Sequence, residues 1–284
     1  SKKTMKFETY MTGFDRNTNS VVKDTFLYDS FTVNRRAPEI TIAPYNTEPT
    51  NGDVTVYASV DEGTLNAKSY TFSENGSFTF EAVNIWGISS SKTVTVSNID
   101  KVAPVLTING NNPETILLGS NYIDAGAAAN DNVPGDIEIT SQSDVDTKKV
   151  GTYTVTYTAK DSAGNTATAE RKVNVVYKFL LLEPISNKSQ FESGSTVPVK
   201  FILTNSSDTK VPSAAAKLFW VDSEGNLKEA ASNGAANKQN YFRYDSSEGL
   251  YIFNLSTKGY SVGKQKIRIV LDDGTHANIE FTLK

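Results

Sequence analysis

The chain has 284 residues, enough for one to three domains, with a formal net charge of −4 and no cysteine. The absence of cysteine excludes disulfides, thiolate metal sites and cysteine nucleophiles, and the small negative charge provides no basic footprint for nucleic acid. No run of 18 apolar residues occurs, so we predict no membrane span. The first ten residues lack the apolar core of a signal peptide, so we expect a fragment of a longer protein.

Segments in which apolar and polar residues alternate recur along the chain, and most are rich in Val, Tyr, Phe, Thr and Ile. This period of two is typical of strands with one buried face. Turn signals such as SAGN at residues 162–165 separate the segments. Many short strands joined by turns predict an all-β fold of antiparallel sandwiches. The predicted strands are residues 53–60, 76–83, 91–99, 151–161, 171–179, 197–203, 249–255 and 266–271.

The dipeptide Ala-Pro occurs twice between two such segments, at residues 37–38 and 103–104, and a third transition follows near Val176. Proline at these places stiffens the crossing and removes a backbone donor, as expected at a joint between domains. Short joints predict an elongated, beads-on-a-string monomer. The expected parts are a strand leader and three sandwiches: residues 1–37, 38–102, 103–177 and 178–284.

The leader is too short to bury a core of its own. We interpret it as the last strands of a truncated upstream domain, or as a hairpin packed on the first sandwich.

Each of the three sandwiches is expected to end with a similar hairpin, which is typical of tandem repeats. In the hairpin of the second, Val155 and Tyr157 share one face of the first strand. In the turn that follows, we expect Gly164 to have a positive φ and Asp161 to accept hydrogen bonds from backbone amides.

These segments resemble known bacterial families. Residues 37–104, with DVTVYASV and GSFTFEAV, resemble a short immunoglobulin-like (Ig-like) repeat of Gram-positive surface proteins, although NIWGIS stands where such repeats carry Asp-Ala-Ala-Gly-Asn. The next segment contains YIDAGA, DNVPGDI and YTAKDSAGN in this order and resembles another bacterial Ig-like repeat. The last contains GSTVPVKFIL and resembles the PxKF-type module of secreted bacterial proteins. The resemblance implies tandem Ig-like sandwiches in an extracellular or cell-wall protein.

The sequence offers little for catalysis, so we expect no enzyme. The single histidine, His276, follows a tight turn without any nucleophile-elbow pattern. No Gly-rich phosphate loop precedes a helix, because hardly any helix is expected.

Calcium is the one cofactor considered. Asp124, Asp131 and Asp136, followed by Asp144 and Asp146, provide the carboxylate oxygens that a hard cation prefers. Their spacing does not match an EF-hand, and Asp also caps turns without any metal. Both interpretations stay open.

Three aromatic residues are candidates for ligand binding: Trp86, Tyr241 and Tyr244. Exposed Trp and Tyr side chains commonly anchor contacts with ligands and other proteins. Alternatively, Trp86 fills a seam between domains, and Tyr241 and Tyr244 belong to a strand.

The expected function is that of a non-catalytic spacer or stalk, which positions an adhesive or catalytic head of its parent protein. The alternative is an accessory carbohydrate- or surface-binding module of a polysaccharide-degrading enzyme. The expected partners are the other domains of the parent protein and a cell-wall or extracellular polysaccharide.

Overall fold

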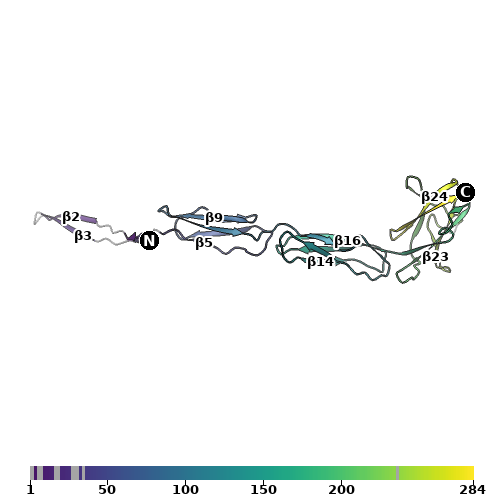
Figure 1. Ribbon diagram of the computed structural model, residues 1–284, viewed down its shortest axis with the longest axis horizontal. Helices are drawn as coiled ribbons and strands as arrows, with labels where there is room; N and C mark the ends of the chain where they lie inside the picture. The colour runs from purple at the N-terminus through teal and green to yellow at the C-terminus, as the bar shows by residue number, and fades with distance from the viewer. Residues whose placement is uncertain (1–2, 5–8, 16–19, 27–31, 34–35, 235–236) are drawn as a thin grey trace. The chain divides into compact units, whose positions relative to one another are not determined.

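A computed structural model describes residues 3–4, 9–15, 20–26, 32–33, 36–234 and 237–284. These residues form strands β1 to β25 and no helix, which confirms the all-β prediction (Figure 1). None of the described segments is therefore a helix long and apolar enough to cross a membrane. The chain divides into two compact units. Unit 1 comprises residues 1–103, 131–136 and 161–165, and unit 2 comprises residues 104–130, 137–160 and 166–284.

The predicted leader contains two pairs of antiparallel strands. β1 (Lys3–Thr4) pairs with β4 (Thr32–Val33), and β2 (Thr9–Asp15) pairs with β3 (Ser20–Phe26). The rest of residues 1–35 lies outside the described part of the chain, and the role of the leader stays a prediction.

The first sandwich consists of two three-stranded sheets in unit 1, with the orders β5-β6-β8 and β10-β9-β7. Alternation along β6 buries Val54 and Val56, which meet Phe80 and Val94 from the other sheet in one core. Its strands are β5 (Ile40–Ile42), β6 (Val54–Val60), β7 (Thr64–Leu65), β8 (Ser69–Phe72), β9 (Gly76–Val83) and β10 (Ser89–Val96).

The middle sandwich pairs a two-stranded sheet, β11-β13, with a four-stranded sheet, β12-β16-β15-β14. Val155, Tyr157 and Val173 form its core, so the predicted shared face of Val155 and Tyr157 is confirmed. Its strands are β11 (Val105–Ile108), β12 (Glu114–Leu117), β13 (Ala127–Asn130), β14 (Glu138–Ser143), β15 (Gly151–Lys160) and β16 (Thr166–Val176).

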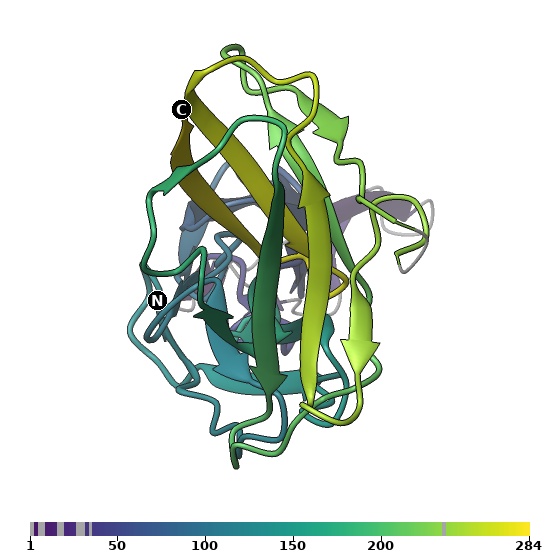
Figure 2. The same cartoon turned by 90° about the vertical axis from the view of Figure 1, so that its right-hand side faces the viewer.

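The C-terminal sandwich has the largest core, built from sheets β17-β19-β23-β22 and β18-β25-β24-β20-β21 (Figure 2, green to yellow). Trp220 lies in this core next to Tyr260, with ring centroids 3.8 Å apart. Its strands are β17 (Lys178–Leu182), β18 (Gln190–Phe191), β19 (Thr196–Thr204), β20 (Ala216–Val221), β21 (Leu227–Glu229), β22 (Arg243–Asp245), β23 (Leu250–Ser256), β24 (Gly263–Leu271) and β25 (His276–Leu283).

Two details differ from the sequence prediction. The sandwiches are not purely antiparallel, because β12 runs parallel to β16 and β18 runs parallel to β25. The predicted strand at residues 171–179 is in fact two strands, with Tyr177 between them. The amide of Tyr177 donates to a carboxylate oxygen of Asp273 at 2.8 Å instead of continuing a strand ladder. Each pair of sheets lies within one predicted segment, whereas the domain bounds themselves stay predictions.

Candidate functional site

All three sandwiches use the turn of their last hairpin to bind the segment that enters them. In the first, Asn84 from the β9–β10 turn donates its Nδ2 to the carbonyl oxygen of Arg36 at 3.0 Å. In the middle sandwich, Asn165 from the β15–β16 turn donates its Nδ2 to the carbonyl oxygen of Asp100 at 2.9 Å. The second of these contacts lies within unit 1, because that unit includes residues 161–165.

The C-terminal sandwich achieves the same result with a carboxylate. Asp273, from the β24–β25 turn, accepts the hydrogen bond of the Tyr177 amide described above. We call these three contacts the turn–joint hydrogen bonds. They give the repeated hairpin a structural role at each entering segment.

The β15–β16 turn has the predicted geometry. Gly164 has φ +94°, and Asp161 accepts hydrogen bonds from the amide and the side chain of Asn165, both at 2.8 Å. Burial opposes ionisation of Asp161, but the bonds from Asn165 hold the pKa of its carboxyl below the ordinary value. Asp161 is therefore a carboxylate at neutral pH.

Asp161 also belongs to a cluster of acidic side chains in unit 1. One carboxylate oxygen each of Asp100, Asp131 and Asp161 lies within 4.8 Å of the others, the one such group of three among the described residues. Asp100 and Asp161 are both buried. We call these three residues the aspartate cluster.

Only one of the three predicted calcium ligands belongs to this cluster, namely Asp131. Asp136 is exposed, and Asp124 lies elsewhere, in unit 2. Asp100 and Asp161 were not predicted as ligands. The signal for them was indirect, since Asp100 precedes an Ala-Pro joint and Asp161 opens a hairpin turn.

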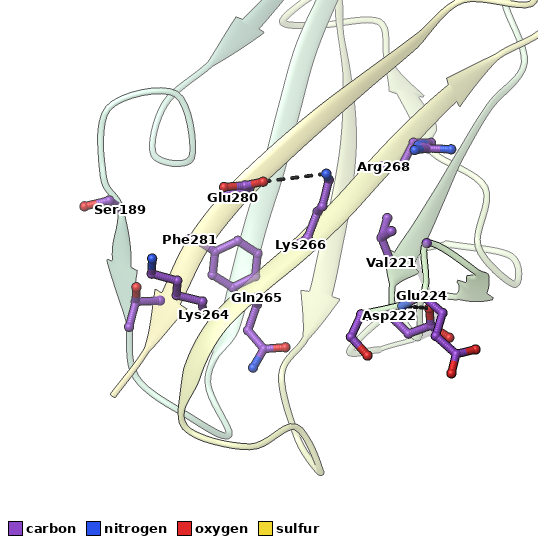
Figure 3. A pocket seen from close by; sticks show the side chains of 13 residues that line it. Ser189, Val221, Asp222, Glu224, Lys264, Gln265, Lys266, Arg268, Glu280 and Phe281 are labelled. Carbon is purple, nitrogen blue, oxygen red and sulfur yellow. Dashed lines mark hydrogen bonds and ion pairs between the residues drawn. The ribbon is translucent and has the colours of Figure 1, made fainter.

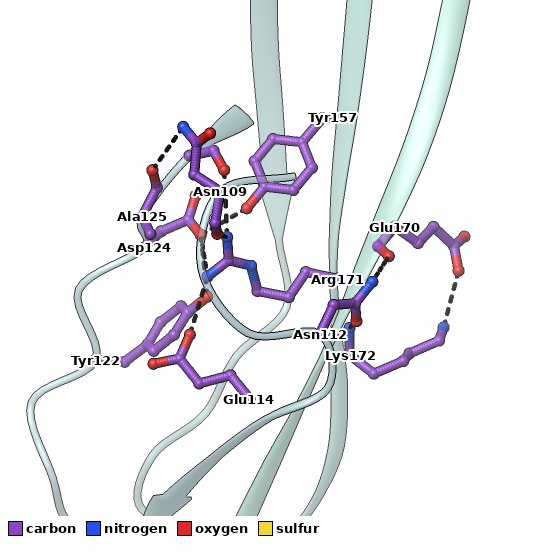
Figure 4. A network of polar contacts seen from close by, with 11 residues as sticks. Asn109, Asn112, Glu114, Tyr122, Asp124, Ala125, Tyr157, Glu170, Arg171 and Lys172 are labelled. Carbon is purple, nitrogen blue, oxygen red and sulfur yellow. Dashed lines mark hydrogen bonds and ion pairs between the residues drawn. The ribbon is translucent and has the colours of Figure 1, made fainter. Parts of the chain in front are cut away.

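Asp124 is part of a polar network around Arg171, whose side chain is fully buried (Figure 4). Nη1 of Arg171 lies 2.9 Å from Glu114 and 3.5 Å from Asp124. The hydroxyl of Tyr157 donates to Asp124 at 2.6 Å, and that of Tyr122 donates to it at 3.1 Å. Asp124 therefore serves as a counter-ion of Arg171.

The charges of this network shift the pKa values of its members. Burial opposes ionisation of Asp124, but the bonds from Tyr157 and Tyr122, together with Arg171, lower the pKa of its carboxyl. Burial and the bond to Asp124 raise the pKa of each tyrosine to about 12.

The three candidate aromatic residues lie in different surroundings. Trp86, at the tip between β9 and β10 in unit 1, is 49% exposed. In unit 2, the ring of Tyr241 faces Lys217, whose Nζ lies 4.7 Å from the ring centroid. Tyr244 packs its ring against Tyr251, with centroids 5.1 Å apart, beside the core. The three aromatic candidates therefore do not share a set of neighbours among the described contacts.

A groove lies over strands β20, β24 and β25 of the C-terminal sandwich (Figure 3). Its lining mixes three basic with three acidic side chains, and Lys266 and Glu280 form an ion pair at 3.6 Å. The lining contains one aromatic side chain, Phe281, and that ring is buried. The groove therefore offers neither a surface of one charge nor an exposed ring.

The single histidine of the sequence, His276, begins β25 and is exposed.

Comparison with protein families supports the Ig-like assignment for the middle sandwich. Residues 106–175 match a family described as bacterial surface protein, Ig-like domain. Over 131 residues, the chain is 33% identical to Hyalin of Strongylocentrotus purpuratus. This match covers 43% of the chain and 11% of Hyalin, so the chain spans about a tenth of that relative.

Several solved structures of tandem domains resemble the chain at low identity. Titin domains I67–I69 are 11% identical, with 88% of this chain and 99% of that chain covered and a TM-score of 0.31. Sidekick-1 immunoglobulin domains 1–5 are 11% identical, with 98% and 66% covered and a TM-score of 0.31. The Yersinia pseudotuberculosis adhesin InvE is 10% identical, with 87% and 58% covered and a TM-score of 0.28. Because these TM-scores are below 0.5, the fold assignment rests on the strands and cores of this chain.

Proposed function

We propose that the chain is a non-catalytic spacer of tandem Ig-like sandwiches in a secreted or cell-wall-attached bacterial protein. In this role it holds an adhesive or catalytic head at a distance from the cell or against its substrate. A spacer needs sandwiches that are stable separately and joints that resist bending. The match of residues 106–175 to surface-protein Ig-like domains supports this setting.

The observation that carries the proposal is the joint between β16 and β17 in unit 2. Tyr177 is the single residue between these strands, and it is buried. Its amide forms the turn–joint hydrogen bond with Asp273, and the amide of Ser206 donates to the carbonyl oxygen of Leu118 at 2.8 Å. Leu118, from the middle sandwich, also packs against the C-terminal core. A joint with no free residue and contacts on two sides should bend little.

Spin-label distance measurements test this stiffness. The chain has no cysteine, so Ser141→Cys and Lys264→Cys, both at exposed positions of unit 2, place one label on each side of the joint. We expect a narrow distance distribution for the natural joint. Inserting Gly-Ser-Gly-Ser between Val176 and Tyr177 should broaden it, because the inserted residues are flexible.

The matched control is the same insertion between Ser223 and Glu224, in the exposed turn after β20, which should leave the distribution narrow. Equally broad distributions for the natural joint and the insertion at the joint would contradict the spacer proposal.

The exposed indole of Trp86 favours one second candidate, a carbohydrate- or surface-binding module of a parent enzyme. Aromatic side chains at a surface commonly supply such contacts. A screen against cell-wall and extracellular polysaccharides would test it. Retention that is lost in Trp86→Ala would support the module, and no retention would leave the spacer as the better explanation.

A further inference from the structure

The aspartate cluster brings three negatively charged side chains together in unit 1. Asp100, Asp131 and Asp161 take part in no ion pair among the described residues. Lys101, next in sequence to Asp100, instead pairs with Asp53 at 2.7 Å. Buried carboxylates in native proteins are normally paired with a cation or bound to a metal.

At the first Ala-Pro joint, an arginine of the chain itself neutralises a nearby carboxylate. There, acidic residues follow β6, and Asp61 forms a hydrogen-bonded ion pair with Arg36. Arg36 stands two residues before the proline of the first Ala-Pro joint, and Val102 stands at this position before the second. The second joint thus has three clustered carboxylates and no arginine at this position.

Asp131 provides a second, independent observation. Its Oδ1 atom is fully buried and has no hydrogen-bond partner among the described residues. A buried carboxylate oxygen without a partner loses its hydration and gains nothing in return. Asp131 follows β13 and contributes its oxygen to the cluster with Asp100 and Asp161. A cation bound among the three carboxylates would provide Asp131 with the partner that its buried oxygen lacks.

We propose that the aspartate cluster binds a calcium ion. All three ligand groups are carboxylates, which suit a hard cation, and the cluster contains neither histidine nor cysteine to favour zinc. Three carboxylates supply three to six oxygens, and water completes the six to eight that calcium requires. The ion connects Asp100, at the end of the first sandwich, with the loops at residues 131–136 and 161–165, all in unit 1. The site does not depend on the spacer role.

The test is a calcium titration of the whole chain by calorimetry after chelator treatment. We expect saturable binding with a Kd of about 10⁻⁴ to 10⁻³ M, the range of extracellular calcium modules. Asp131→Asn keeps the shape of the side chain but removes its charge, and should weaken binding at least tenfold. Asp136→Asn is the matched control, because Asp136 is exposed in the same loop and lies outside the cluster. It should bind calcium as the natural chain does.

Nuclear magnetic resonance of the natural chain locates the ion without any substitution. Added calcium should shift the amide signals of Val102, Asn132 and Asn165 and leave that of Asp124 unchanged. This measurement decides the matter even where Asp131→Asn fails to fold. No saturation by the natural chain at 10 mM calcium (about ten times the upper Kd above), equal affinities of the two variants, or shifts confined to the surroundings of Asp124 would each overturn the proposal.

Discussion

The positively charged side chain of Arg171 is fully buried in the middle sandwich, so its charge and its donors need partners within the protein. Glu114 and Asp124 compensate it, and its Nη2 donates to the backbone carbonyls of Asn109 and Gly126. Removing one partner of a buried ion pair leaves an uncompensated charge, which costs about 3–5 kcal/mol. The acidic residues around Asp124 could be recognised in the sequence. The burial of Arg171 beside Asp124 could not be predicted, because an arginine on a strand usually faces water.

The network should make the middle sandwich sensitive to pH in two opposite windows. The pKa of Asp124 is lower in the folded state than its ordinary value of 3.8. Its contribution to the free energy of unfolding is therefore present above pH 3.8 and is lost as the pH falls below this value. The folded pKa values of Tyr157 and Tyr122 are raised from 10.0 to about 12, so their contribution is present below pH 10 and is lost as the pH rises towards 12.

Urea midpoints of the middle-sandwich transition, measured across these two windows, test this expectation. Between them the contribution of the network should stay constant. Tyr157→Phe removes one of the two titrating hydroxyls, so it should flatten the alkaline side. It also removes a hydrogen bond that lowers the pKa of Asp124, so it should reduce the acidic side as well. An alkaline side of unchanged slope in Tyr157→Phe would mean that the network does not control the response.

At the scale of elements, the alternation of side chains predicted strands and their buried faces well, as for Val155 and Tyr157 in β15. It predicted nothing for β14, all six of whose residues are exposed, because no buried face imposes a pattern there. It also could not reveal that β12 runs parallel to β16, since alternation is the same for either direction. The aspartate cluster was missed because its members lie 30 or more positions apart and meet only in the fold.

The turn NIWGIS shows one further limit of the sequence pattern. It lacks the Asp and Asn that flank Gly164, yet Gly87 also has a positive φ, of +74°. Asn84 takes the role of Asp161, because its Oδ1 accepts hydrogen bonds from the amides of Trp86 and Ile88, both at 3.0 Å. Asn and Asp both form such bonds with nearby amides. A different residue at the start of the turn thus gives the same hairpin.

Two glycines with positive φ should respond differently to the same substitution. In Gly164→Val, the added Cβ would lie 3.8 Å from Nδ2 of Asn51, an ordinary contact, so only the strained φ counts and the cost is about 1–3 kcal/mol. In Gly63→Val, the Cβ would lie 2.2 Å from the carbonyl oxygen of Val83, so the backbone must move and the cost should be larger.

Chemical denaturation of the two variants measures both costs. Gly76→Val is the control, because Gly76 has no positive φ and an added Cβ would meet nothing within 4 Å. It should cost no more than about 0.5 kcal/mol, as ordinary surface substitutions do. A smaller cost for Gly63→Val than for Gly164→Val would show that the Gly63 turn has been misjudged.

At the scale of the whole molecule, the sandwiches have three separate hydrophobic cores. Each core is formed by residues of one sandwich, apart from partly buried side chains such as Leu118 at the joint in unit 2. The Ala-Pro prolines, Pro38 and Pro104, are both buried. Pro38 stands two residues before β5, and Pro104 stands directly before β11, each of which is the first strand of a sandwich. The repeated Ala-Pro dipeptide therefore marks the same local structure at two joints, namely a buried proline with a turn–joint hydrogen bond nearby.

Separate cores and short joints predict an extended monomer in solution. A single globular body of 284 residues would have a radius of gyration of about 19 Å. We expect small-angle scattering to give a clearly larger value, because three separate cores connected by short joints should not merge into one globular body. Light scattering on the same sample should give the monomer mass of 30.9 kDa, which rules out dimers as the cause of a large radius. A radius near 19 Å at the monomer mass would show that the sandwiches fold back on one another, and the spacer proposal would lose its physical basis.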